Sequence, residues 1–204
     1  MKKIFYFSIL IFIFLIPISQ YLSVRILLIS FAVAIFFSLR KNTFTKLLTN
    51  SWDILVYLIV LIFGLLYTSD LTQGLRVLET NFSFLAIPVI FSSLQLNSKQ
   101  LNNLWISFIL GGVTASLICL SFASVSFFQD YEFTHFFYYN LTNPIGFQPT
   151  YFAYYLSFAI SLLLYTLLSN QMSVSRQVII VGLFFMFFML MLTAGRTAYI
   201  ATLF

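Results

Sequence analysis

Three arginines in otherwise apolar stretches could bind a phosphate group. Arg25 lies within YLSVRILLIS, Arg76 within TQGLRVLETN and Arg196 within LTAGRTAYIA. A charged side chain at membrane depth is costly, and such residues usually face a helix bundle or an aqueous cavity. The guanidinium stays charged and donates parallel hydrogen bonds to phosphate oxygens. Taken together, the three arginines favour a site for a polyanionic lipid headgroup.

A simpler interpretation applies to each arginine alone. A long arginine side chain near a helix end can extend to the lipid headgroups, which keeps its charge in water. Arg76 and Glu79 are three residues apart, so they can pair on one helix face. The sequence leaves this alternative open beside the shared phosphate site.

A second concentration of polar and aromatic residues follows at 140–160, in the stretch NLTNPIGFQPTYFAYYLSFAI. Asn143, Pro144 and Gly146 are turn residues, and Pro149 suits the first turn of a helix, where its missing N–H costs nothing. An ordinary interfacial aromatic belt would also explain the tyrosines that follow. The residues that we expect to contact an outer cavity are Gln148, Tyr151 and Asn143.

Other chemically reactive residues near this stretch are few. His135 is the only histidine, and a lone histidine beside aromatic residues is more often an interfacial residue than a catalyst. The triplet Asn140, Leu141, Thr142 matches a glycosylation sequon, but so short a pattern arises easily by chance. Cys119 is the only cysteine, which excludes an intrachain disulfide and a CxxC metal site. We expect no metal, no cofactor and no nucleic-acid partner.

The composition indicates which elements must position these residues. Hydrophobic residues make up 61% of the 204 residues and charged residues 7%, with a mean hydropathy of +1.02. These values are typical of an integral membrane protein. Apolar runs of about 20 residues predict helices that cross the bilayer. The runs are 4–18, 22–39, 52–68, 77–95, 104–128, 149–168 and 175–194, with a partial run at 197–204.

The sequence therefore predicts an all-α fold, a polytopic transmembrane helical bundle forming one domain over 1–204. It would have about seven spans and a truncated eighth, with an outer loop at 129–148. Cytoplasmic loops collect lysine and arginine. With a cytoplasmic amino terminus, seven basic residues fall inside and only Arg25, Arg76 and Arg196 fall outside. This charge split predicts that orientation.

Two short motifs resemble the O-antigen ligase and polymerase superfamily, which are multispan glycosyltransferases of bacterial envelopes. The first is Gln148-Pro149-Thr150-Tyr151-Phe152, similar to the family's His-Pro-Thr-Tyr-Phe-like helix start. The second is Thr193-Ala194-Gly195-Arg196, similar to its Thr-x-Ser-Arg-like motif. The stretches SWDILVYLIVLIFGLLYTSD and GLRVLE also resemble its third and fourth spans.

Two positions depart from the family pattern. Gln148 stands where a histidine is often found, and Gly195 stands in place of the serine before the arginine. Glutamine exchanges hydrogen bonds but cannot titrate. The departure argues against a proton-transfer role at position 148.

The resemblance implies a function for the arginines. Such enzymes take a glycan from an undecaprenyl-pyrophosphate donor at the outer face of the bacterial inner membrane and pass it to a lipid A core, another glycan or a protein. No nucleotide is needed, because the pyrophosphate is already an activated leaving group. Arg196 is the first candidate to hold the donor pyrophosphate, Arg76 the second and Arg25 the third.

The resemblance also implies that the chain is the amino-terminal half of a longer enzyme. Family members are about twice as long, and their acceptor-activating histidine lies in a loop beyond residue 204. We therefore expect 1–204 alone to be inactive. Two other interpretations stay open: part of a transporter or exporter whose arginines bind an anionic substrate, and an inert membrane remnant.

Overall fold

The structure, a computed structural model, describes residues 2–40, 52–93, 96–169 and 175–193. These residues form helices and short connections with no strand among them, which confirms the predicted all-α class. Most helices follow the apolar runs closely. The elements are α1 (Lys2–Leu15), α2 (Gln20–Arg40), α4 (Trp52–Gly64), α5 (Leu71–Ser93), α6 (Ser98–Asp130), η1 (Phe133–Phe136), α7 (Tyr138–Thr142), η2 (Asn143–Ile145), α8 (Pro149–Ser169) and α9 (Arg176–Thr193).

Three helices of the described part are long and apolar enough to cross a membrane, fewer than the seven predicted spans. They are α6, α8 and α9. Among the other helices, α1 and α4 are too short to cross a bilayer, and α5 is too polar in its first half. The 14 residues of α1 and the 13 of α4 rise only about 20 Å at 1.5 Å per residue, against roughly 30 Å of hydrocarbon. The first half of α5 carries polar side chains beside Arg76.

Helix α5 begins six residues before its predicted start at 77. Asp70 explains the difference, because its carboxylate oxygen Oδ1 accepts the backbone N–H of Gln73 at 3.0 Å. This is the hydrogen bond of a helix N-cap, which satisfies an amide that the first turn leaves without a partner. The helix therefore includes Gly74 and Arg76, which the hydropathy pattern had placed in a connection.

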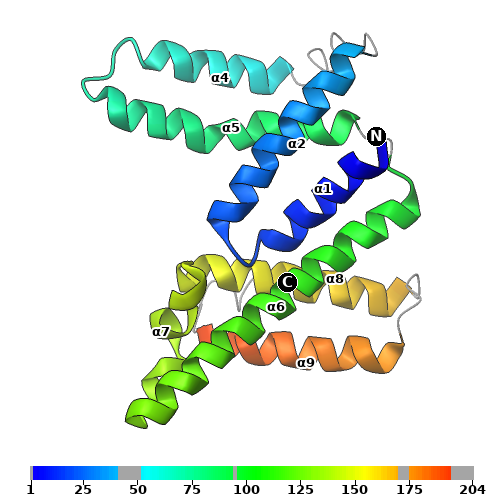
Figure 1. Cartoon of the computed structure of the whole chain (residues 1–204), viewed down its shortest axis with the longest axis vertical. Coiled ribbons are helices and arrows are strands. Elements are labelled where there is room, and N and C mark those ends of the chain that lie inside the picture. The colour runs from blue at the N-terminus through cyan, green and yellow to red at the C-terminus, as the bar shows by residue number, and fades with distance from the viewer. Residues whose placement is uncertain (1, 41–51, 94–95, 170–174, 194–204) are drawn as a thin grey trace. The chain divides into compact units, whose positions relative to one another are not determined.

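The chain packs as two compact units. The first comprises Met1–Ile9 and Val24–Asn97. In it α4 and α5 lie side by side as a hairpin (Figure 1). The hydroxyl of Tyr57 donates to the side-chain oxygen of Asn81 at 3.0 Å, which ties α4 to α5. The hydroxyl of Ser30 donates to that of Ser8 at 3.2 Å and links α2 to α1.

The second unit comprises Leu10–Ser23 and Ser98–Phe204. Its core is formed by α6, α8 and α9, with α8 and α9 running antiparallel beside one another (Figure 1). Gly111 and Gly112 allow close packing on α6: Gly111 lies against Phe14, and Gly112 lies against Met186 of α9. The single transmembrane domain over 1–204 stays a prediction. The partial span 197–204 lies outside the described residues.

Candidate functional site

The 129–148 loop is folded throughout and rests on three helices. Its elements η1, α7 and η2 pack against the end of α6, and α7 also contacts α8 and α9 (Figure 1). Leu141 and Thr142 are fully buried, and Phe147 is nearly so. A loop that inserts apolar side chains in this way is fixed in place by the same burial that holds a core together.

The loop covers one end of the α8–α9 pair, where the first motif and Thr193, the first residue of the second motif, both lie. Pro149 opens α8 and Thr193 closes α9. Because the two helices are antiparallel neighbours, these residues lie at the same end of the pair, and α7 contacts both helices there. Phe152 and Thr193 are each fully buried. Arg196 follows Thr193 but lies outside the described residues.

The predicted turn chemistry at the start of α8 is confirmed. Pro149 is the first residue of the helix and is buried. The backbone carbonyl of Gln148 accepts the N–H groups of Tyr151 and Phe152 at 3.0 and 3.2 Å. Gly146 adopts a φ of 71°, a left-handed conformation that glycine accepts without strain. The backbone thus enters α8 through a defined turn.

The three residues predicted to contact an outer cavity lie on the surface of this region. The side chains of Gln148, Tyr151 and Asn143 are exposed, with Tyr151 at 57%. Their exposure makes them accessible to a molecule approaching the loop from solvent or from the membrane surface. Their contact with a substrate stays a prediction.

The predicted cluster of three arginines is described only in part. Arg25 on α2 and Arg76 on α5 both belong to the first unit, and both are exposed. Exposure suits either an anion site or an extension to headgroups. The convergence of all three on one pyrophosphate stays a prediction, because Arg196 lies outside the described residues.

The loop contains an ion pair that the sequence interpretation did not include. His135 Nε2 lies 2.6 Å from Asp130 Oδ2. The other carboxylate oxygen of Asp130 accepts the backbone N–H of Glu132 at 3.0 Å, which fixes the plane of the carboxylate. The missed signal was an acid at the end of a helix, followed five residues later by histidine.

Two strained backbone conformations lie close to this pair in the sequence. Tyr131 and Tyr138 have positive φ values of 60° and 54°. A residue other than glycine in this conformation costs about 1–3 kcal/mol and is retained where the surroundings hold it. The side-chain amide of Asn140 donates to the carbonyl oxygen of Thr134 at 3.3 Å and helps to hold the turn. No group of three or more His, Cys, Asp or Glu side chains suitable for a metal ion occurs among the described residues.

Asp130 lies beyond the predicted span 104–128, and its pKa is lowered. The main cause is the hydrogen bond from the backbone N–H of Glu132, followed by the one from His135. A carboxyl with a depressed pKa in the folded state stabilises that state above its ordinary value of about 3.9. This contribution is lost as the pH falls through the lower folded-state value.

We expect the loop to open when Asp130 is neutralised. Asp130→Ala should speed amide hydrogen exchange of residues 131–137 at neutral pH, because both acceptor oxygens are lost. The wild-type loop should show the same faster exchange, after correction for intrinsic rates, only in acid below the pKa of Asp130. Asp70→Ala, which removes another exposed carboxylate that accepts a backbone N–H, is the matched control. Unchanged loop exchange in Asp130→Ala would show that the pair does not hold the turn.

Thr142 carries the most unusual polar atom in the loop. Its side chain is fully buried, and its hydroxyl oxygen has no hydrogen-bond partner. The same burial removes the threonine of the Asn140–Thr142 sequon from the surface. A buried polar group without a partner costs stability, so this hydroxyl marks a weak point in the packing of α7.

Thr142→Val should therefore raise the free energy of unfolding by about 1 kcal/mol, since valine keeps the shape and removes the unsatisfied hydroxyl. Equilibrium unfolding in mixed micelles would measure the change. Thr193→Val is the matched control, because the hydroxyl of Thr193 donates to the carbonyl oxygen of Leu190 at 2.7 Å. A clear loss of stability in Thr142→Val would mean that the hydroxyl has a partner.

Aromatic rings cluster where α6 leads into the loop. Phe127 on α6 lies at the centre, with ring centroids 4.8 to 6.0 Å from those of four neighbours. The neighbours of Phe127 are Phe128, Tyr131, Phe133 and Phe136. The first three of these side chains are largely exposed, at 69 to 74%.

The pKa of Tyr139 in the same loop is raised, mainly by the charge of the adjacent Tyr138.

No family model, curated protein or solved structure matches this chain.

Proposed function

We propose that this protein takes part in the transfer of envelope glycans. It would move a glycan from an undecaprenyl-pyrophosphate donor to a lipid A core, glycan or protein acceptor. The carrying observation is that the first motif, at the start of α8, and Thr193, the first residue of the second motif, lie at the same end of the α8–α9 pair although they are about 45 positions apart in the sequence. A folded loop lies over that end, as a shared site would require.

The proposed site lies at the outer face of a bacterial inner membrane, with the amino terminus in the cytoplasm. The seven-to-three split of basic residues supports this orientation. With it, the 129–148 loop and all three candidate arginines fall on the same side of the membrane. The helices α6, α8 and α9 supply spans of suitable length.

The proposed mechanism assigns the leaving group to the arginines. As the acceptor hydroxyl attacks the anomeric carbon, the bond to the donor's pyrophosphate breaks and negative charge grows on that pyrophosphate. Arg196 is the first candidate to stabilise this charge by preorganised hydrogen bonds, followed by Arg76 and then Arg25. The acceptor hydroxyl loses its proton to a general base.

A transfer assay in proteoliposomes tests the proposal. The protein as its gene encodes it would be mixed with a radiolabelled oligosaccharide on undecaprenyl pyrophosphate and with each acceptor class in turn. We expect label on one acceptor class and an equal release of undecaprenyl pyrophosphate. The same oligosaccharide on undecaprenyl monophosphate should react far more slowly, because its leaving group is poorer. Movement of donor across the vesicle without any transfer would instead support the transporter interpretation.

A further inference from the structure

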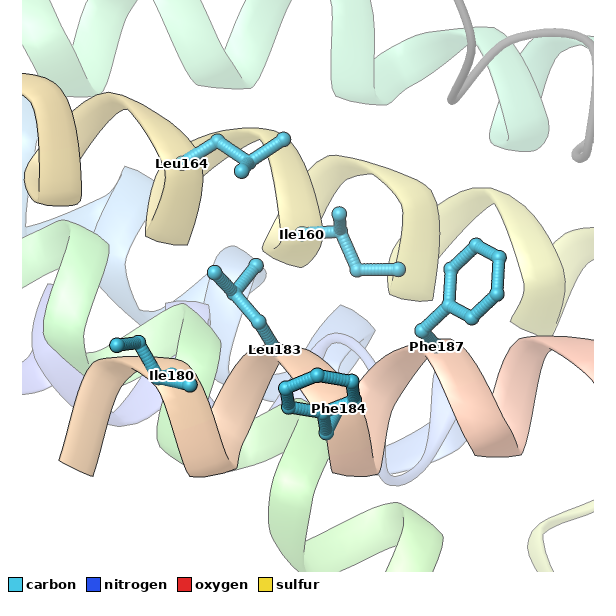
Figure 2. Close-up of a pocket in the computed structure, with 6 residues that line it drawn as sticks. All are labelled: Ile160, Leu164, Ile180, Leu183, Phe184 and Phe187. Atoms are coloured by element: carbon cyan, nitrogen blue, oxygen red, sulfur yellow. The ribbon is translucent and has the colours of Figure 1, made fainter. Parts of the chain in front are cut away.

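The α8–α9 pair carries an apolar groove between its two helices. Figure 2 shows side chains of both helices turned toward the space between them. The groove has a volume of about 300 Å³. Ile160 is 5% exposed and forms its floor, whereas Phe184 is 74% exposed and forms its rim. The lining residues are Ile160, Leu164, Ile180, Leu183, Phe184 and Phe187.

A single charged side chain lies in line with this groove. Arg176 is the first residue of α9 and is exposed. At about 100° per residue, Arg176 and the four groove residues of α9 fall within an arc of about 100°. They therefore share one face of the helix, with the arginine at its end.

The distances along α9 match one leaflet of a bilayer. At 1.5 Å per residue, the lining begins about 6 Å from Arg176, at Ile180, and ends about 17 Å away, at Phe187. Half of the hydrocarbon core is roughly 15 Å thick. With Arg176 at the level of the headgroups, the apolar groove would thus extend from there to the bilayer midplane.

The charge distribution favours an anionic occupant. The described acidic residues of this unit are Asp130 and Glu132, both in the connection that leads to the opposite end of α8. Among the described residues of this unit, therefore, no carboxylate lies near the Arg176 end to compete for the guanidinium. We propose that an anionic phospholipid binds here, with its phosphate on Arg176 and one acyl chain in the groove.

The lining of the groove suits a hydrocarbon chain. All six lining residues are apolar, and the groove has a volume of about 300 Å³. A flexible acyl chain can adapt its torsions to a narrow space of this kind.

Native mass spectrometry after release from nanodiscs tests the proposal. The nanodiscs would contain equal amounts of phosphatidylglycerol and phosphatidylcholine with identical acyl chains. We expect the wild-type protein to retain phosphatidylglycerol selectively. Arg176→Gln should reduce retention roughly five- to ten-fold, because one cation near a membrane surface contributes on this scale. Leu164→Trp should reduce it as well by filling the groove.

Two matched variants control the result. Val181→Trp places the same bulk on an exposed position of α9 outside the groove, and Lys99→Gln removes an exposed charge from the start of α6. Both should retain phosphatidylglycerol as the wild type does. Arg176→Gln is a surface change that leaves the core intact, so wild-type retention by this variant would overturn the proposal.

Two further measurements separate the remaining occupants. Glycerol 3-phosphate, which has the phosphate but no chain, should not displace the bound lipid; efficient displacement would mean that the groove plays no part. In a Cys119→Ala background, Phe184→Cys should cross-link between copies no faster than Val181→Cys. Preferential cross-linking through position 184 would place a second copy on the groove and overturn the lipid assignment.

Discussion

Gly111→Ala is expected to lower the free energy of unfolding by about 1–3 kcal/mol, the usual cost of overpacking a core. A Cβ atom at Gly111 would lie 2.1 Å from the carbonyl oxygen of Phe14 and 2.9 Å from Cγ of Pro17. The first contact is to the backbone of the last turn of α1, and the second is to the connection between α1 and α2. Relief therefore requires a shift of a helix or of that connection, not the rotation of a side chain.

The adjacent glycine provides the control. A Cβ atom at Gly112 would lie 3.1 Å from Cε of Met186, the far end of a flexible side chain. Methionine adapts to such changes, so Gly112→Ala should alter the unfolding free energy by less than about 0.5 kcal/mol. Equilibrium unfolding in mixed micelles compares the two variants directly. Equal effects at both positions would contradict the close backbone approach at Gly111.

Arg196→Ala is expected to cause the largest loss of transfer activity, about 100-fold or more in kcat, as for the loss of one transition-state hydrogen-bond donor. Arg196→Lys keeps the positive charge but loses the two-pronged geometry of the guanidinium. Its activity should lie between those of Arg196→Ala and the wild type. Both variants would be assayed in the protein as its gene encodes it, with subsaturating undecaprenyl-pyrophosphate donor.

The control for this series is Lys99→Ala, because Lys99 is an exposed cation on the start of α6 and lies outside both motifs. Its transfer rate should equal that of the wild type. Wild-type transfer by Arg196→Ala would remove Arg196 from the leaving-group site, because a contact of that kind cannot be lost without raising the barrier.

The sequence was sufficient to predict where most helices lie, because apolar runs and Pro149 mark their bodies and one of their starts. It placed the start of α5 at 77 because hydropathy does not register the capping carboxylate of Asp70. Fewer helices of the described residues qualify as spans than the seven predicted, for a related reason. An apolar run can be longer than the helix it forms, as at 52–68, where α4 ends at Gly64.

The candidate site was less predictable than the helices. The Asp130–His135 pair depends on a turn through Tyr131 with positive φ, and no residue type there requires that conformation. The burial of Thr142 depends on how α7 meets α8 and α9, a long-range contact that local patterns do not encode. By contrast, the turn from Gly146 to Pro149 follows from residues with strong local preferences and was predicted.

The length of α6 has a mechanical consequence. Its 33 residues contain no proline and extend about 50 Å, which exceeds the 40–45 Å of a whole bilayer with its headgroups. One continuous helix thus connects the mainly polar residues 98–103 to Asp130. If its tight contact with Phe14 at Gly111 acts as a pivot, the arms on either side measure about 20 and 29 Å. A sideways displacement of Ser98 would then move Asp130 in the opposite direction by about 1.5 times as much, so events at one membrane surface would be transmitted and enlarged at the other.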